Sequence, residues 1–296
     1  MKSNKFRTAV SKALAAATMM LIVTLVSASG AAAADTYKIL HTFTWAANPS
    51  GGLIFDAAGN LYGTTDLGAH GYGVVFKLKP NPDGTWTETT LHSFSGPDGA
   101  YPWAGLTLDA AGNLNGTTLQ GGAYGYGTVF KLKPNPDGSW TESVLHSFAG
   151  GDGGGPTFGS LIFDAAGSLY GATEMGGAYD EGVVFRLTPN PDGTWTESVL
   201  HSFTGGDDGG APFAPLIFDA AGNLYGATVA GGCHNNGVVF KLTPNPDGTW
   251  KETVLHTFYG IGRNPQAGVI LDAAGNLYGT TYAGNGNNGL VFEITP

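Results

Sequence analysis

The chain has 296 residues, with 49 glycines, one cysteine and a formal net charge of −10. A single cysteine excludes an intramolecular disulfide, so burial and backbone hydrogen bonds must stabilise the fold. An acidic chain repels phosphate backbones and anionic lipid surfaces, which argues against nucleic acid and membrane partners.

The first 34 residues have the pattern of a secretory signal peptide. A basic start precedes an apolar run from Ala13 to Val26, and small residues then end in an Ala-x-Ala pattern before Asp35. This predicts cleavage after Ala34 and a secreted or periplasmic protein. The apolar run is nearly long enough to span a bilayer, so an uncleaved anchor is the alternative. Loss of residues 1–34 would remove four of 13 basic residues and no acidic one, leaving nine against 23 and a net charge of −14.

The rest of the chain is a tandem repeat. The stretch DAAGNLYGTT or a close variant starts at five positions that lie 53 to 55 residues apart, namely Asp56, Asp109, Asp164, Asp219 and Asp272. Spacing of this kind is typical of solenoids, propellers and arrays. Each repeat holds four strand-like runs, which in the first repeat are residues 52–56, 60–65, 73–78 and 86–94. Four antiparallel strands make one blade of a β-propeller.

The two ends of the repeat region predict how the blades are arranged. Residues 37–43, YKILHTF, match the fourth strand of other repeats, and the fifth repeat stops after its third strand. We therefore expect an all-β, five-bladed β-propeller of four-stranded antiparallel blades, in which the N-terminal strand completes the last blade. An open array is the alternative. The single domain 35–296 would contain blades at residues 51–95, 104–149, 159–204, 214–259, and 268–296 together with 36–43.

The hairpin between the third and fourth strands fixes a register. If Pro-Asp-Gly forms its loop, Lys77 lies opposite Thr89. The same register would place Lys38 opposite Glu293 where the ring closes.

These motifs resemble a known repeat family. The unit LYGTT…GG…GVVFKL resembles the GloVer (Gloeo-Verruco) tandem repeat over residues 36–296. The stretch GLIFDAAGNLYG is also similar to the core of NHL-type β-propellers. The resemblance implies a bacterial repeat scaffold, and NHL-type propellers mostly bind partners. It implies no particular activity.

Five copies in one chain separate scaffold from candidate site. Residues present in every repeat are expected to be structural, including the histidines His41, His92, His146, His201 and His256. Sequence variation gathers in the loop between strands two and three and in the loop that leads to the next repeat. In an up-and-down blade these loops share one side, here called the variable-loop face. The DAAGN and NPDG turns share the other, the regular-turn face. Loops on a rigid scaffold are where binding sites usually lie.

The variable loops carry the candidate ligand-binding residues. These are Trp45, Tyr72, Tyr101, Trp103, Tyr124, Tyr126, Phe158, Tyr179, Phe213, Tyr282, Asn235 and Asn236. Aromatic faces beside amides suit sugar rings, although the same aromatics could instead plug the central channel. We therefore predict a secreted, non-catalytic, monomeric protein that binds a glycan and needs no cofactor. A structural scaffold that docks an extracellular protein is the alternative.

An enzyme and a metal site are weaker hypotheses. A glycoside hydrolase-like mechanism needs two carboxyls roughly 5–9.5 Å apart. The candidates are Asp66, Glu174, Asp180 and Glu181. The residues His70, Cys233 and His234 fit no standard metal-ligand spacing, so we expect no metal.

One position departs from the repeat within a strand. Asn115 stands where the other four repeats have tyrosine. It could open a polar niche or have no effect.

Overall fold

The computed structural model describes residues 37–296 apart from 45–46, 69, 157 and 285–287. The predicted signal peptide and Trp45 lie outside the described residues. Residues 41–296 form one unit that is distinct from residues 1–40. All regular secondary structure in the described part of the chain is β. No helix there is long and apolar enough to cross a membrane.

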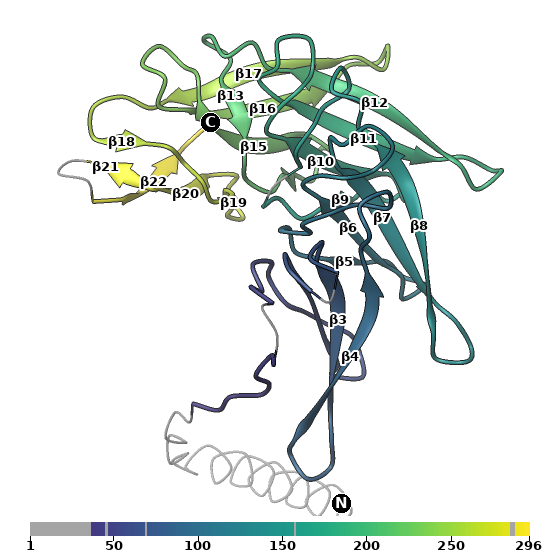
Figure 1. Ribbon diagram of the computed structural model, residues 1–296. Coiled ribbons are helices and arrows are strands. Elements are labelled where there is room, and N and C mark those ends of the chain that lie inside the picture. Colours follow the sequence, from purple (N-terminus) through teal and green to yellow (C-terminus); the bar gives the residue numbers. More distant parts are fainter. Residues whose placement is uncertain (1–36, 45–46, 69, 157, 285–287) are drawn as a thin grey trace, which may run out of the picture. The chain divides into compact units, whose positions relative to one another are not determined.

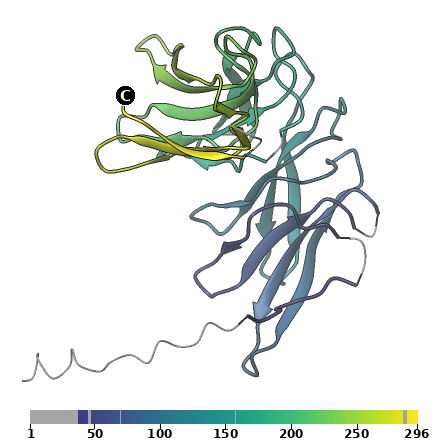
Figure 2. The same ribbon diagram turned by 90° about the vertical axis from the view of Figure 1, so that its left-hand side faces the viewer.

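The first three repeats fold as expected, each into a four-stranded antiparallel sheet (Figure 1). The first sheet has the order β1-β2-β3-β4, with β1 (Ile54–Phe55), β2 (Leu61–Thr65), β3 (Val74–Pro80) and β4 (Trp86–Ser93). The second contains β5 (Thr107–Leu108), β6 (Leu114–Thr118), β7 (Thr128–Pro134) and β8 (Trp140–Ser147). The third contains β9 (Ile162–Phe163), β10 (Leu169–Thr173), β11 (Val183–Pro189) and β12 (Trp195–Ser202). Each sheet keeps a narrow colour range in Figure 2, because one continuous stretch of chain builds it.

The last two repeats vary this plan. The fourth contains β14 (Ile217–Phe218), β15 (Leu224–Ala230), β16 (Val238–Pro244) and β17 (Trp250–Thr257), and β13 (Gly210–Pro212) pairs with the end of β15. The fifth is a three-stranded sheet of β19 (Ile270–Leu271), β20 (Leu277–Thr281) and β22 (Leu290–Ile294). A separate ladder joins β18 (Gly262–Arg263) to β21 (Ala283–Gly284).

The expected fourth strand of the last sheet is not observed. Residues 37–43 have no strand assignment, so β22 is an edge strand. Its Val291 is 78% exposed, whereas the equivalent Val75, Val129, Val184 and Val239 are fully buried. The structure therefore supports four-stranded antiparallel sheets in the first four repeats, but the five-bladed closure is not seen in it.

The repeated turns have the predicted chemistry. In the first DAAGN turn, Asp56 Oδ1 accepts hydrogen bonds from the amides of Ala58 and Asn60, each 2.9 Å long. Gly59 has a φ of +79°, which a side chain would strain. This turn therefore needs both its aspartate and its glycine, which explains why the pattern recurs.

The predicted hairpin register is confirmed, and a bulge follows it. Lys77 pairs with Thr89 across β3 and β4. The partners then jump from Phe76–Thr90 to Val75–His92, so Leu91 is an extra residue. A bulge re-aims the side chains beyond it. The same irregularity occurs in β7–β8, β11–β12 and β16–β17.

Consecutive sheets are held together by a phenylalanine that directly follows each fourth strand. Phe94 packs edge-on against Phe130 of the next sheet, with ring centroids 5.1 Å apart. Phe148–Phe185 and Phe203–Phe240 repeat this contact at 5.1 Å. Burial of such large rings and their favourable edge-to-face geometry stabilise the stack of sheets.

Candidate functional site

Three of the predicted ligand-binding aromatics form a continuous row of ring contacts on the variable loops. The rings of Trp103 and Phe158 are stacked at 5.6 Å, and Phe158 contacts Phe213 at 4.7 Å. They come from the loops that enter the second, third and fourth repeats, at one equivalent position. The indole Nε1 of Trp103 is buried and has no hydrogen-bond partner.

The predicted tyrosines are mostly exposed. Tyr179 is 61% exposed and Tyr126 is 47% exposed. The backbone carbonyl of Tyr126 accepts a hydrogen bond from Gly155, and the amide of Met175 donates to Gly154. Since Met175 is also exposed, apolar side chains flank the Gly154–Gly155 segment where the second and third repeats meet. Tyr72, Tyr124 and Tyr282 are exposed as well, on other parts of the variable loops.

Other predicted residues shape the loops themselves. Tyr101 and Asn235 have positive φ values of 59° and 52°. The side chain of Asn235 accepts a hydrogen bond from the Gly231 amide, and the carbonyl of Asn236 accepts one from Asn264. Asn235 and Asn236 thus have structural partners already.

The four candidate carboxylates have separate environments. Asp66 has a buried oxygen without a partner. Burial raises the pKa of the Glu174 carboxyl. Asp180 accepts a hydrogen bond from the amide of Gly176 in its own loop, which is a turn-capping role. The backbone carbonyl of Glu181 accepts from Ala211.

The weak metal candidates make one contact. Cys233 Sγ lies 2.9 Å from Nδ1 of the adjacent His234. His70 is exposed. Within the described residues, a different group brings three possible ligand atoms together.

Asn115 does line a pocket, on the regular-turn side of the second and third repeats. The pocket has a volume of about 560 Å³, and Lys131, Asp109 and Trp195 also line it. In the other repeats a tyrosine hydroxyl donates to the turn aspartate, as Tyr62 does to Asp56 at 2.9 Å. In the second repeat the Lys131 ammonium lies 3.7 Å from Asp109 instead.

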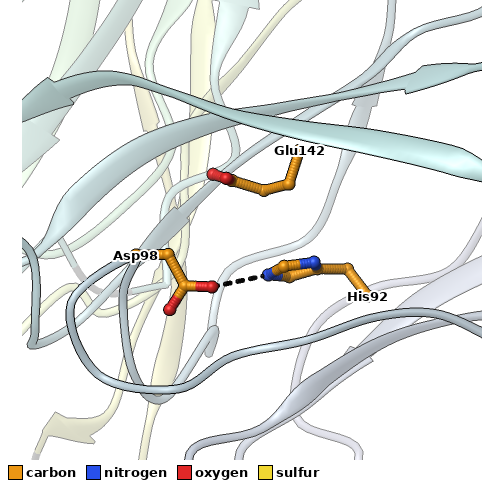
Figure 3. Close-up of side chains that lie close together, drawn as sticks. All are labelled: His92, Asp98 and Glu142. Atoms are coloured by element: carbon orange, nitrogen blue, oxygen red, sulfur yellow. Dashed lines mark hydrogen bonds and ion pairs between the residues drawn. The ribbon is translucent and has the colours of Figure 1, made fainter.

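A cluster that the sequence did not predict joins neighbouring sheets at the variable-loop side. His92, Asp98 and Glu142 converge in Figure 3, and their ligand atoms all lie within 4.8 Å of one another. His92 Nε2 is 2.9 Å from Asp98 Oδ2. Asp98 Oδ1 accepts hydrogen bonds from the Ser95 amide at 2.8 Å and hydroxyl at 2.9 Å.

The strand register explains this convergence. Phe94 packs against Phe130 of the next sheet, and His92 lies two residues before it with their rings 4.8 Å apart. Both side chains therefore face the second repeat. Glu142 pairs with the buried Leu132, which packs in the same cluster as Phe94. Histidine and glutamate thus meet between the two sheets.

The histidine–aspartate pair recurs twice. His146 is 2.9 Å from Asp152, and His201 is 3.3 Å from Asp208. Glu197 and Glu252 occupy the place of Glu142, opposite Leu187 and Leu242. In each of the three glutamates, the Oε1 atom is buried and has no hydrogen-bond partner.

Charge and burial shift the proton affinities in these clusters. Burial, followed by the negative charge of Asp98, raises the pKa of Glu142 to about 7. The pKa values of Glu197 and Glu252 also rise to about 7, by burial and then by Asp152 and Asp208 respectively. Burial works to raise the pKa of Asp98, but hydrogen bonds from Ser95 and His92 outweigh it and hold that pKa below its usual value.

The missed residues had a signal in the sequence. An aspartate follows the fourth-strand histidine by six or seven residues at three boundaries between consecutive sheets, here called seams. No aspartate follows His41 or His256 at that distance.

Repeated antiparallel sheets that interlock through strand-four phenylalanines define an all-β repeat protein with propeller-like blades. The sequence profile of the Gloeobacter/Verrucomicrobia repeat family matches residues 24–196 and 135–296. The chain belongs to this family. No curated protein matches its sequence.

Several solved structures are similar at low identity. A protein of unknown function from Dyadobacter fermentans DSM 18053 is 15% identical, with 84% of this chain and 78% of that chain covered and a TM-score of 0.48. An endo-arabinase from Bacteroides thetaiotaomicron VPI-5482 is 16% identical, with coverages of 84% and 94% and a TM-score of 0.45. A luciferin-regenerating enzyme is 14% identical, with coverages of 84% and 92% and a TM-score of 0.47. Likeness at this level carries no argument about function.

Proposed function

We propose that the protein is a secreted or periplasmic, non-catalytic binding protein that holds a glycan on its variable-loop face. The observation that carries this proposal is the exposed aromatic surface at the second and third repeats. Tyr126 and Tyr179 expose large rings there, and the Trp103–Phe158–Phe213 row adds further aromatic surface on the loops that enter the second, third and fourth repeats. Exposed aromatic patches on soluble proteins mark interaction sites.

A sugar fits this surface better than a charged ligand does. A pyranose ring offers an apolar C–H face to an aromatic ring and hydroxyls to nearby amides. The unpartnered Nε1 of Trp103 is a donor that a sugar oxygen could satisfy after a local side-chain shift. The acidic net charge of −10 disfavours polyanions.

The test is a glycan array with the purified chain and two loop variants. We expect binding to a defined glycan, with at least a tenfold loss on Tyr126→Ala or Trp103→Ala, because each removes ring contact area. Phe55→Ala is the matched control, since Phe55 is an exposed aromatic beside a DAAGN turn. Silence across a broad array, with a protein partner captured through the same residues, would replace the glycan by a docking function.

We further propose that the scaffold is a closed five-bladed ring, with residues 36–43 as the fourth strand of the last blade. Two observations support this. The outer face of β22 exposes Val291, unlike the equivalent valines in the other repeats. Phe43 packs on Phe76 at 5.1 Å, which repeats the contact that a fourth-strand phenylalanine makes with the following sheet. Closure would remove an exposed sheet edge.

A further inference from the structure

The three His–Asp–Glu clusters between sheets have the donor set of a metal site. The first cluster offers one imidazole nitrogen and two carboxylates within 4.8 Å of one another, and Glu142 reaches it from a different repeat than His92 and Asp98 do. In the other two, a histidine–aspartate pair lies in the equivalent place, and Glu197 or Glu252 occupies the position of Glu142. Imidazole with carboxylate ligands suits Zn²⁺ and related first-row ions. Ca²⁺ prefers six to eight oxygen ligands, which three side chains including a histidine do not supply.

We propose that each of these clusters binds one Zn²⁺-like divalent cation, which ties two neighbouring sheets together. This inference is independent of the glycan proposal.

The geometry of the first cluster is close to that of a bound ion. Donors that lie 2.0–2.2 Å from one tetrahedral ion are about 3.3 Å apart. The His92–Asp98 separation is 2.9 Å, and all three donor atoms are within 4.8 Å. A small rotation of the Glu142 side chain would complete the set and give its unpartnered Oε1 a ligand.

The surroundings hold the ligands in place. Ser95 binds the other oxygen of Asp98, which leaves Oδ2 directed at the cluster. The Ala149 amide holds Asp152 in the same way at 2.8 Å. Such outer hydrogen bonds orient metal ligands.

The same three residue types recur at three seams, which argues against a chance grouping. The loop after His201 is one residue longer, and Asp208 still reaches His201 at 3.3 Å. The chain also has an internal control, because Glu88 occupies the same register opposite Leu78, but the loop after His41 contains no aspartate. If these glutamates were purely structural, they would not need an aspartate after the neighbouring histidine. The aspartate nevertheless follows the histidine at all three of these seams.

The experiment is a calorimetric titration of the chelator-treated chain with ZnCl₂ at pH 7.5. A Cys233→Ser background removes the exposed thiol beside His234, which could bind Zn²⁺ by itself. We expect three equivalents per chain, two after Glu142→Gln, and none after the triple change Glu142→Gln, Glu197→Gln and Glu252→Gln. Glu88→Gln is the matched control and should keep three.

Two results of the titration would contradict the proposed zinc sites. Absence of Zn²⁺ uptake by the parent chain would overturn the proposal, as would uptake that the triple variant retains. Uptake of Ca²⁺ in preference to Zn²⁺ would overturn the assigned ion class. Because glutamine matches glutamate in shape, circular dichroism of the triple variant should match the parent and so exclude misfolding. A cobalt(II) absorption band of tetrahedral type, lost in the triple variant, would support the site by a second readout.

Discussion

At the scale of single residues, Asn115 shows what the loss of one repeated side chain does. The four tyrosines at this position each donate to a turn aspartate, at 2.9 to 3.2 Å. Asn115 is only 1% exposed, and its Oδ1 has no partner. Lys131 has turned to Asp109 and lies 5.9 Å from the Trp195 ring, whereas Lys77 and Lys241 lie over their own tyrosines.

Asn115→Tyr should stabilise the protein by about 1 kcal/mol, because the ring would enter the pocket and its hydroxyl would reach Asp109. Urea denaturation of the variant and the parent measures this difference. Tyr170→Asn, which creates the same defect in the third repeat, is the reciprocal control and should be destabilising. A destabilised Asn115→Tyr variant would mean that the pocket cannot accept the ring.

The strand-four phenylalanines supply a second residue-scale prediction. Phe148 is fully buried against Phe185. Phe148→Ala should lower the free energy of unfolding by about 3–5 kcal/mol, since it removes buried apolar area and leaves a cavity. Chemical denaturation followed by tryptophan fluorescence measures the change. Phe43→Ala should cost less, because Phe43 is only partly buried. Equal losses would contradict the importance that we assign to burial at the seam.

At the scale of elements, the blades were predictable and the seams were not. The turn chemistry of DAAGN and the Lys77–Thr89 register follow from neighbouring residues, so local rules were enough to find them. The close approach of His92 and Glu142 depends on the bulge at Leu91. It also depends on how the first and second sheets pack, which brings together residues that are far apart in the sequence. Sequence alone encodes neither the bulge nor the direction in which the histidine points afterwards.

The same seams predict how stability depends on pH. The folded-state pKa of Glu142, Glu197 and Glu252 is about 7, above the ordinary value of 4.5. These groups therefore favour folding fully below pH 4.5, and this contribution is lost as the pH rises through 7. Asp98, Asp152 and Asp208 face them, together with His92, His146 and His201.

We expect the metal-free protein to be more stable at pH 6 than at pH 8, and the triple glutamate-to-glutamine variant to lose most of that difference. Thermal melts in chelator across this range measure it. His201 acts in the opposite sense, because burial lowers its pKa and protonation below pH 6.5 opposes folding. An unchanged pH profile in the triple variant would show that the three glutamates are not its source.

At the scale of the whole molecule, the last sheet ends in the unpaired edge of β22. The equivalent valines of the other third strands are buried in clusters that contain residues of the following sheet, whereas Val291 on β22 is left exposed. An apolar sheet edge invites pairing with another strand, from the same chain or from a second copy. Residues 37–43 carry the sequence of a fourth strand, including the histidine and phenylalanine at matching positions.

The closed ring therefore predicts a specific cross-link. In a Cys233→Ser background, Lys38→Cys and Glu293→Cys would face each other, because Lys77 faces Thr89 at the equivalent place. Directly opposite residues in an antiparallel pair can approach closely enough for a disulfide. We expect an intramolecular disulfide on mild oxidation, seen as a shift on a non-reducing gel and as loss of both free thiols. Ile39→Cys with Glu293→Cys is the control, since a one-residue change in register places the side chain on the opposite face of the sheet. Disulfide-linked dimers in place of the intramolecular product would indicate that a second copy completes the blade, and equal cross-linking of both pairs would argue against an ordered fourth strand.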